Sequence, residues 1–361
     1  MKYGFIGLGL IGGSIAKAIH EKIEHAEIIA YDINREATQQ ALAEGVITQV
    51  AAEIGFEFRE CDTIFLCAPV QKNDENLLKI RSFLKPGAIV TDVGSVKTPI
   101  HEVIREAGLE GQFIGGHPMA GSERIGYAAS KATILQNAYY ILTATPKTPR
   151  RAVDTFRDLV SALGALPIDM TYEQHDYIVA GVSHLPHVIA ASLVNLVKDS
   201  DSADGLMKMV AAGGFKDITR IASSSPVMWQ QICLSNGENI LKLLDAYIGS
   251  LQGIRGEIAE KQSEDLYRLF DSARTYRDSF VGTSAGPIKV SYALTIDIAD
   301  EPGALAAIAT ILALNGISIK NIGILHNREY LGGDLRVEFY DEDGLNKARE
   351  VLNAKAYTTH G

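Results

Sequence analysis

A glycine-rich segment near the N-terminus constrains the fold of this chain more than any other feature. The apolar run KYGFIG leads into GLGLIGGS, which places Gly7, Gly9 and Gly12 in a GxGxxG pattern between a predicted strand and a predicted helix. Asp32 ends the second predicted strand, 20 residues after Gly12. A glycine turn in this position, followed by an acidic residue at this distance, indicates a dinucleotide-binding domain.

Each part of the glycine turn has a mechanical role in holding a pyrophosphate. Gly7 permits the tight turn, Gly9 lets the backbone approach the phosphates, and Gly12 lets the helix pack closely against the strand. The helix that starts near Leu10 and Ile11 presents unpaired N–H groups and the positive end of its dipole to the phosphates. We therefore expect these five residues to bind a cofactor.

The acidic residue at the end of the second strand indicates which cofactor binds. Asp32 is expected to accept hydrogen bonds from the adenosine ribose hydroxyls, and its negative charge would repel a 2′-phosphate. This favours NAD over NADP, although the nearby Arg35 could soften the preference. We also place Ala68 and Pro69, at the end of the predicted strand DTIFLCAP, among the cofactor-binding residues.

Changes in hydrophobic periodicity divide the chain into three predicted domains. Residues 1–170 alternate apolar strands with helices, which predicts a Rossmann-like, doubly wound parallel sheet. Residues 171–283 show only helical spacing, which predicts an all-α domain for substrate binding and dimerisation. After the Gly- and Pro-containing linker 281–287, residues 288–361 read as βαββαβ, the ferredoxin-like arrangement.

Composition excludes several classes of function. The net charge of −10 argues against nucleic acid as a partner, and the three cysteines have no metal-binding spacing. No apolar run reaches the roughly 20 residues that a membrane span requires. An odd number of cysteines without a signal sequence favours a cytoplasmic protein.

Two polar residues follow neighbouring strands of the predicted sheet. Ser95 lies in DVGSVK and His117 in GGHPMAGSE, and ligands of open parallel sheets bind beyond the carboxyl ends of the strands. Histidine can accept a proton near neutral pH, and a serine hydroxyl could fix its tautomer. The alternatives are a structural loop histidine for His117 and a helix N-cap for Ser95.

Two motifs in the helical domain also carry polar groups. In GVSHLPH, Ser183 and His187 are four residues apart and so share a helix face, while Pro186 should bend the helix and free a backbone carbonyl. We interpret this segment as a wall of a substrate pocket, because no third ligand with matching spacing supports a metal site. Arg220, on a largely apolar helix, either pairs with an acid such as Asp217 or binds an anionic ligand.

These motifs together resemble prephenate dehydrogenases that carry a C-terminal ACT domain. The matching segments are GLGLIGGS, DVGSVK, GGHPMAGSE, GVSHLPH, GGFKDITRIASSSPVMW and DEPGALAAIATILALNGISIKNI, and they span nearly the whole chain. The resemblance implies NAD-dependent oxidative decarboxylation of prephenate to 4-hydroxyphenylpyruvate, CO2 and NADH, in tyrosine biosynthesis.

The resemblance also implies roles for individual residues. His117 would be the base for the 4-hydroxyl of prephenate, with Ser95 beside it, and Arg220 would clamp the ring carboxylate. The remaining substrate-binding residues would be Ser183, His187 and Ser224 lining the pocket, Trp229 walling it and Glu123 gating its mouth.

In the ACT domain the resemblance points to an effector site near the DEPG turn. The positions concerned are Asp300, Pro302, Gly303, Asn315 and Asn321, and the natural effector would be L-tyrosine, the end product of the pathway. An ACT domain that only supports dimerisation is the alternative, because the tail AYTTHG looks short for a full last strand.

The sequence is also compatible with other functions. The chain could be an arogenate or cyclohexadienyl dehydrogenase, although a histidine and no acid within 181–191 favours prephenate. A β-hydroxyacid dehydrogenase would not explain the tail. A non-catalytic dinucleotide and amino-acid sensor would need neither His117 nor Arg220. We expect a homodimer, because helical domains that follow a Rossmann half commonly form the dimer interface.

Overall fold

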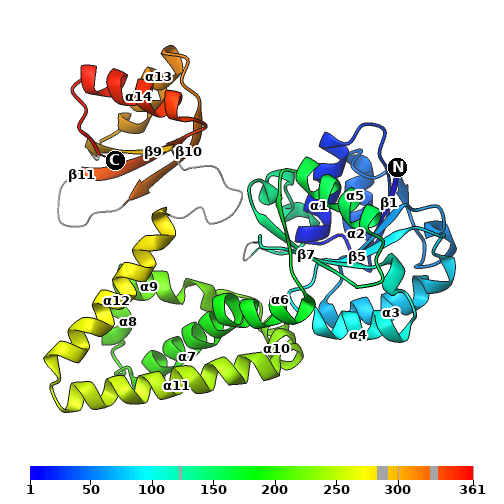
Figure 1. Cartoon of the computed structure of the whole chain (residues 1–361), viewed down its shortest axis with the longest axis horizontal. Helices are drawn as coiled ribbons and strands as arrows, with labels where there is room; N and C mark the ends of the chain where they lie inside the picture. Colours follow the sequence, from blue (N-terminus) through cyan, green and yellow to red (C-terminus); the bar gives the residue numbers. More distant parts are fainter. Residues whose placement is uncertain (122–123, 283–291, 300, 326–331, 361) are drawn as a thin grey trace. The chain divides into compact units, whose positions relative to one another are not determined.

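A computed structural model describes residues 1–121, 124–282, 292–299, 301–325 and 332–360. The chain forms two compact units, residues 1–251 and residues 252–361. Figure 1 shows the helices and strands coloured along the sequence. The domain ends that we predict at residues 170 and 283 remain a prediction.

The first unit begins with a five-stranded parallel sheet whose strand order is β3-β2-β1-β4-β5. The strands are β1 (Lys2–Ile6), β2 (Glu27–Tyr31), β3 (Gln49–Val50), β4 (Thr63–Leu66) and β5 (Ile89–Asp92). The helices among them are α1 (Leu10–Lys22), α2 (Arg35–Ala43), α3 (Val70–Ile80) and α4 (Thr98–Glu106). Two apolar clusters form the core of this region, and β4 and β5 are buried along their whole length. The Rossmann-like arrangement is confirmed, because this is its strand order.

A second, three-stranded sheet continues the α/β region. It contains β6 (Ile114–Pro118), β7 (Tyr139–Ala144) and β8 (Leu166–Asp169), with α5 (Arg150–Ala162) between the last two. Strand β7 runs parallel to β8, as expected, but antiparallel to β6. This reversal departs from the uniformly parallel order that the apolar runs suggested. Only short 3-10 turns, Tyr127–Ala129 and Ala132–Leu135, separate β6 from β7 in the described part of this segment, so no crossover helix returns the chain to the same direction.

The helical region that follows lacks strands in its described residues, as predicted. Its helices are α6 (Tyr172–Val179), α7 (Leu185–Ser200), α8 (Leu206–Val210), α9 (Gly213–Thr219), α10 (Pro226–Ser235), α11 (Gly237–Ala259) and α12 (Ser263–Gly282). A capping box at Thr171 and Gln174 starts α6.

One continuous helix in this region, Tyr172–Ser200, is long and apolar enough to cross a membrane by length and composition alone. In its most apolar stretch of 18 residues, 22% is buried inside the protein. The sequence pattern predicted no such segment. The same helix carries His175, Asp176 and His184, which are buried and hydrogen-bonded inside the first unit. These contacts are typical of a core helix in a packed domain.

The second unit contains the end of α11, the whole of α12 and the predicted βαββαβ arrangement. The elements of that arrangement are β9 (Tyr292–Ala299), α13 (Ala304–Leu314), β10 (Ile319–Leu325), β11 (Gly332–Phe339), α14 (Glu342–Ala354) and β12 (Thr359–His360), and the sheet order is β10-β11-β9-β12. The last strand does pair with β9, through Thr359 opposite Ile296 and His360 opposite Thr295. This ferredoxin-like unit fits an ACT-like domain.

Candidate active site

The glycine turn has the geometry that a bound pyrophosphate requires. Gly7 has a φ of 100°, and a Cβ there would lie 2.7 Å from the backbone carbon of Cys67. A Cβ on Gly12 would lie 2.5 Å from the carbonyl oxygen of Gly7, so α1 could not pack this closely with any larger residue. A Cβ on Gly9 would meet no heavy atom of the described residues within 4 Å. The residues present therefore fit a dinucleotide, with room at Gly9 for the phosphates.

Asp32 is held in place at the carboxyl end of β2. Its Oδ2 accepts a hydrogen bond of 2.6 Å from the backbone N–H of Leu8, and its Oδ1 accepts one of 2.7 Å from that of Asn34. The carboxylate is thus oriented against the glycine turn. After β4, the N–H of Ala68 donates to the buried Asn73 amide oxygen at 3.1 Å, and Pro69 precedes α3. Ala68 therefore presents its carbonyl and methyl groups, rather than its N–H, to a ligand.

A cavity of about 360 Å³ lies beyond the carboxyl ends of β5 and β6. It brings together seven of the predicted site residues: Ser95, His117, Ser183, His187, Arg220, Ser224 and Trp229. The other lining residues are Pro118, Met119, Ala120, Gly121, Ile221, Met228 and Ile232. Glu123 lies outside the described residues. Segments that are more than 100 residues apart in the sequence thus form one pocket within the first unit, lined by both polar and apolar residues.

A buried ion pair fixes the two strand ends that carry Ser95 and His117. The Lys97 ammonium pairs with the Asp92 carboxylate at the end of β5, and both side chains are almost fully buried. Lys97 Nζ also donates a hydrogen bond of 2.7 Å to the carbonyl of Gly116, the residue before His117. Because one ammonium joins both strand ends, the positions of the loop with Ser95 and of His117 depend on each other.

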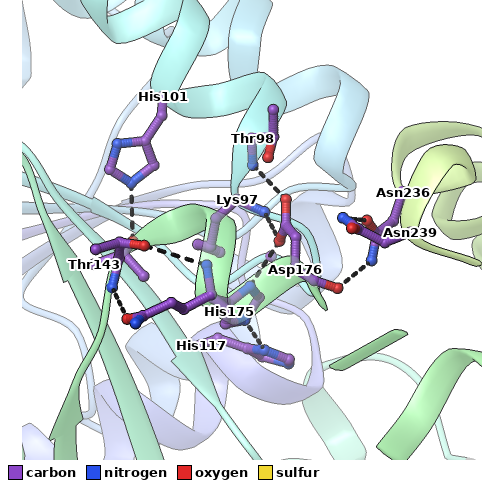
Figure 2. Close-up of polar contacts among 12 residues, drawn as sticks. Lys97, Thr98, His101, His117, Thr143, His175, Asp176, Asn236 and Asn239 are labelled. Carbon is purple, nitrogen blue, oxygen red and sulfur yellow. Dashed lines mark hydrogen bonds and ion pairs between the residues drawn. The ribbon is translucent and has the colours of Figure 1, made fainter. Parts of the chain in front are cut away.

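His117 is hydrogen-bonded to a histidine–aspartate pair on α6 (Figure 2). Nδ1 of His117 lies 2.8 Å from Nε2 of His175, and Nδ1 of His175 lies 2.7 Å from Oδ1 of Asp176. The Asp176 carboxylate also accepts the backbone N–H groups of Lys97 and Thr98, each at 2.8 Å. His175 and Asp176 are 0% and 1% exposed.

Sequence reasoning does not identify this pair, and it assigns the tautomer of His117 to Ser95. In the structure His175 occupies Nδ1 of His117, and Ser95 contributes to the cavity wall. The signal present was the sequence TYEQHDYIV, in which a histidine and an aspartate follow one another directly after a capping box. Nothing local to that helix shows which distant side chain they contact.

The surroundings of His117 favour its neutral form. Burial lowers the pKa of His117 well below its usual value, and the nearby charges of His175, Lys97 and His184 act in the same direction. Burial raises the pKa of Asp176, but hydrogen bonds from His175 and from Lys97 and Thr98 outweigh it and leave the pKa below its usual value. The imidazole is therefore neutral near pH 7, with a lone pair that can take part in proton transfer, and the carboxylate stays ionised.

A π-helical turn, Ala180–His184, separates α6 from α7 immediately before Pro186. We predict that this proline bends the helix, and a π-helical turn is a frequent form of helix distortion at functional sites. Beyond it, the ring of His187 stacks on Trp229, with centroids 3.6 Å apart. Trp229 Nε1 is buried without a hydrogen-bond partner among the described residues.

Arg220 begins a 3-10 turn, Arg220–Ser223, that follows α9. Its side chain is exposed and lines the cavity together with Ser224, whose hydroxyl donates to the carbonyl of Ile221 at 2.8 Å. Within the described part of the chain, no group of three or more His, Cys, Asp or Glu side chains could hold a metal ion.

The buried side chain of His101 should make the stability of the protein depend on pH. Burial lowers the pKa of His101 to about 4, and its Nε2 is hydrogen-bonded to Thr143 at 2.9 Å. Because the unfolded chain takes up a proton near pH 6.5, stability from this residue is complete above that pH and is lost as the pH falls toward 4. We expect the free energy of unfolding to drop by about 2 kcal/mol between pH 7 and pH 5 from His101 alone.

Urea unfolding at both pH values measures this drop. The variant His101→Gln should show a smaller difference between pH 7 and pH 5 than the wild type, whatever its absolute stability. An unchanged difference would contradict the assignment of a depressed pKa to His101.

Family models and a related protein that match this chain are all described as prephenate dehydrogenases. Residues 15–168 match the family model described as "Prephenate dehydrogenase, nucleotide-binding domain", and residues 171–272 match "Prephenate dehydrogenase, dimerization domain". A prephenate dehydrogenase of Bacillus subtilis is 40% identical over 97% of this chain and 95% of its own length.

Two solved structures resemble the chain at similar identity. Prephenate dehydrogenase from A. aeolicus, in complex with hydroxyphenyl propionate and NAD+, has a TM-score of 0.73 and 32% identity, covering 78% of this chain and 98% of its own. Synechocystis arogenate dehydrogenase has a TM-score of 0.70 and 30% identity, covering 78% of this chain and 100% of its own.

Proposed function

We propose a mechanism for this chain, which belongs to the prephenate dehydrogenase family. The enzyme catalyses the NAD-dependent oxidative decarboxylation of prephenate to 4-hydroxyphenylpyruvate and CO2, a step of tyrosine biosynthesis. The observation that supports the mechanism is the cavity that joins His117 and Arg220 beyond the ends of β5 and β6. The reaction requires NADH and CO2 to form in equal amounts from prephenate, which a paired assay of both products tests.

The cofactor site is the glycine turn at the start of α1. Gly7, Gly9 and Gly12, with the N-terminus of α1 at Leu10 and Ile11, would hold the pyrophosphate of NAD. Asp32 would accept the ribose hydroxyls, with Ala68 and Pro69 beside it. When bound, NAD+ supplies the acceptor for the hydride that leaves C4 of the substrate.

His117 is the base of the reaction. Its Nε2 accepts the proton of the substrate 4-hydroxyl, which lets the C–O bond gain double-bond character as the hydride leaves. Loss of the ring carboxylate as CO2 then returns electrons to the ring and places negative charge on the same oxygen. His117 gives its proton back to that oxygen, so the base ends the reaction neutral and no net proton is released.

The rest of the cavity binds and orients a dianionic substrate. Arg220 is the clamp for the ring carboxylate, because a guanidinium can bind a carboxylate through two hydrogen bonds. Ser95 lines the same cavity as His117 and would contact the substrate hydroxyl. Ser183, His187 and Ser224 line the pocket and Trp229 walls it, with a buried indole N–H available for a ligand oxygen. Glu123 as a gate remains a prediction.

The residues that would surround the side chain of the substrate favour prephenate over arogenate. Arogenate carries an ammonium where prephenate has a keto group, and an acid nearby would favour that ammonium. The described residues that line the cavity include no Asp or Glu, whereas His187 and Arg220 are present. The likeness to an arogenate dehydrogenase makes arogenate the competing substrate.

The negative charge of Asp32 should determine the preference for NAD+ over NADP+. The variant Asp32→Asn keeps an oxygen that can accept the Leu8 N–H but loses the negative charge. We expect kcat/KM for NAD+ to fall about tenfold and its ratio to kcat/KM for NADP+ to fall further, since 1.4 kcal/mol corresponds to one decade. Steady-state kinetics with both cofactors measures this ratio. As a matched control, Arg35→Ala should increase the ratio, and a ratio unchanged in Asp32→Asn would contradict the role of Asp32.

The match to a dimerization-domain model supports a homodimer. Large apolar side chains on α7, α10 and α11 are exposed within the first unit, and a second copy would bury them: Leu196 (62%), Val227 (64%), Leu234 (72%) and Leu241 (59%). Leu196 lies on the apolar helix Tyr172–Ser200, so a second copy would cover part of that helix. We also propose a cytoplasmic location, which the odd number of cysteines favours.

The ferredoxin-like unit is the proposed site of feedback control by L-tyrosine. Gly303, with a φ of 97°, precedes α13, and Asn315 ends it. With Pro302 and Asn321 these residues would surround the effector, whereas Asp300 lies outside the described residues. Titration of the full chain with tyrosine should inhibit NADH formation, and Asn321→Ala should weaken the inhibition. Activity unaffected by tyrosine would favour a purely assembly-supporting unit.

A further inference from the structure

We infer that His175 and Asp176 are positioning residues for the base: they hold His117 in the tautomer with a free Nε2 and provide the negative charge that balances it when protonated. The inference rests on the proposed role of His117. It concerns two residues on α6 that lie outside the cavity lining.

Hydrogen-bond direction fixes the tautomers one after another. The Asp176 carboxylate is ionised and can only accept, so Nδ1 of His175 must donate to it. In a neutral His175 the remaining nitrogen, Nε2, then carries a lone pair and accepts. It can be satisfied only by a proton on Nδ1 of His117, 2.8 Å away. Nε2 of His117 is therefore left without a proton, as a base requires.

The Asp176 carboxylate is placed so that its own charge is maintained. It accepts the backbone N–H groups of Lys97 and Thr98 at the start of α4, where the helix dipole favours an anion. The Lys97 ammonium does not neutralise it, because that group is paired with Asp92. Nδ2 of Asn236 donates to the Asp176 carbonyl at 2.7 Å, which ties this turn of α6 to α10.

The groups around His117 explain why a balancing charge is needed. His175 on α6, Lys97 before α4 and His184 in the π-helical turn all oppose a positive charge on His117. Asp92 on β5 is engaged by Lys97, while His187 and Arg220 face the same cavity. Asp176 is thus the anion that can stabilise a protonated His117, through His175. Related histidine–aspartate pairs in other enzymes set both tautomer and charge in this way.

Three variants test the inference by kinetics. We expect His175→Leu and Asp176→Asn to lower kcat by about 10²–10⁴-fold with KM for prephenate changed less than about threefold. His175→Gln, whose amide can accept from His117 and donate to Asp176, should retain more activity than His175→Leu. His101→Gln is the matched control, because it replaces a buried, hydrogen-bonded histidine outside the site and should keep kcat.

The pH profile separates positioning from a merely structural role. Asp176→Asn removes the charge that stabilises protonated His117, so the acid limb of kcat/KM should move to lower pH than in the wild type. Thermal unfolding of each variant identifies any variant that fails to fold. If a variant fails to fold, the tautomer of His117 measured in the wild type tests the inference instead. An acid limb and kcat both close to those of the wild type in folded Asp176→Asn would overturn the inference.

The tautomer itself can be read without turnover. In the full chain labelled with 15N-histidine, we expect His117 to carry its proton on Nδ1 at neutral pH, with its resonance assigned by comparison with His117→Asn. A proton on Nε2 would overturn the inference even if prephenate is the substrate. Conversely, a chain with the expected tautomer that fails to oxidise prephenate would refute the proposed function alone.

Discussion

Replacing His117 by asparagine is expected to lower kcat for prephenate oxidation by about 10²–10⁴-fold, because the substrate 4-hydroxyl would lose its proton acceptor. The KM for NAD+ should change little, since we propose that the glycine turn and Asp32, rather than His117, hold the cofactor. Steady-state measurement of NADH formation at saturating prephenate gives kcat directly.

The pH dependence of the wild type sharpens this expectation. Because burial lowers the pKa of His117 well below its usual value, the base stays neutral and kcat/KM should hold steady as the pH falls through about 6.5. The decline should come only at more acidic pH, where His117 takes up a proton, and His117→Asn should lack that limb. Full turnover in His117→Asn would remove His117 from the role of base.

Replacing Arg220 by alanine should raise the KM for prephenate by about 10- to 150-fold. Hydrogen bonds to charged groups contribute roughly 1.5–3 kcal/mol, and each 1.4 kcal/mol is one decade of affinity. The KM for NAD+ should stay the same, because Arg220 lines the substrate cavity rather than the glycine turn. Arg220→Lys keeps the charge but not the planar fork, so an intermediate KM is expected.

A matched control comes from the same helical segment. Lys216 on α9 is also an exposed cation but does not line the cavity, so Lys216→Ala should leave the KM for prephenate unchanged. A KM in Arg220→Ala equal to that of the wild type would take Arg220 out of the clamp.

Much of this architecture could be predicted because its signals are local. The glycine turn, the strand before it and Asp32 lie within one stretch of chain, and each has a steric or electrostatic reason at its own position. His117 and Ser95 could be placed because each follows or ends a strand, although β5 and β6 belong to different sheets that are joined by a single parallel bridge between Val90 and Phe113. The βαββαβ order of the second unit likewise follows from periodicity within short segments.

Features that depend on contacts between distant segments could not be predicted. The role of His175 depends on its hydrogen bond to His117, which lies 58 residues earlier in the sequence. The role of Lys97 likewise depends on its hydrogen bond to the carbonyl of Gly116. The antiparallel pairing of β6 with β7 depends on how a segment of short turns folds back, which apolar runs do not encode. A single sequence shows which residues are polar. It does not show which distant groups form hydrogen bonds with them once they are buried.

The acidic composition of the chain also fits the site. A protein with a net charge of −10 that binds a dianionic substrate and a pyrophosphate needs local positive groups. Arg220 at the cavity and the N-terminus of α1 at the glycine turn are the elements placed to meet that need.

The most direct test of the proposed reaction is NADH formation by the purified full chain with prephenate and, separately, with arogenate. We predict turnover with prephenate and a kcat/KM lower by about tenfold or more with arogenate, which corresponds to 1.4 kcal/mol of discrimination. A higher kcat/KM for arogenate, or NADH formation with neither substrate, would contradict the proposal.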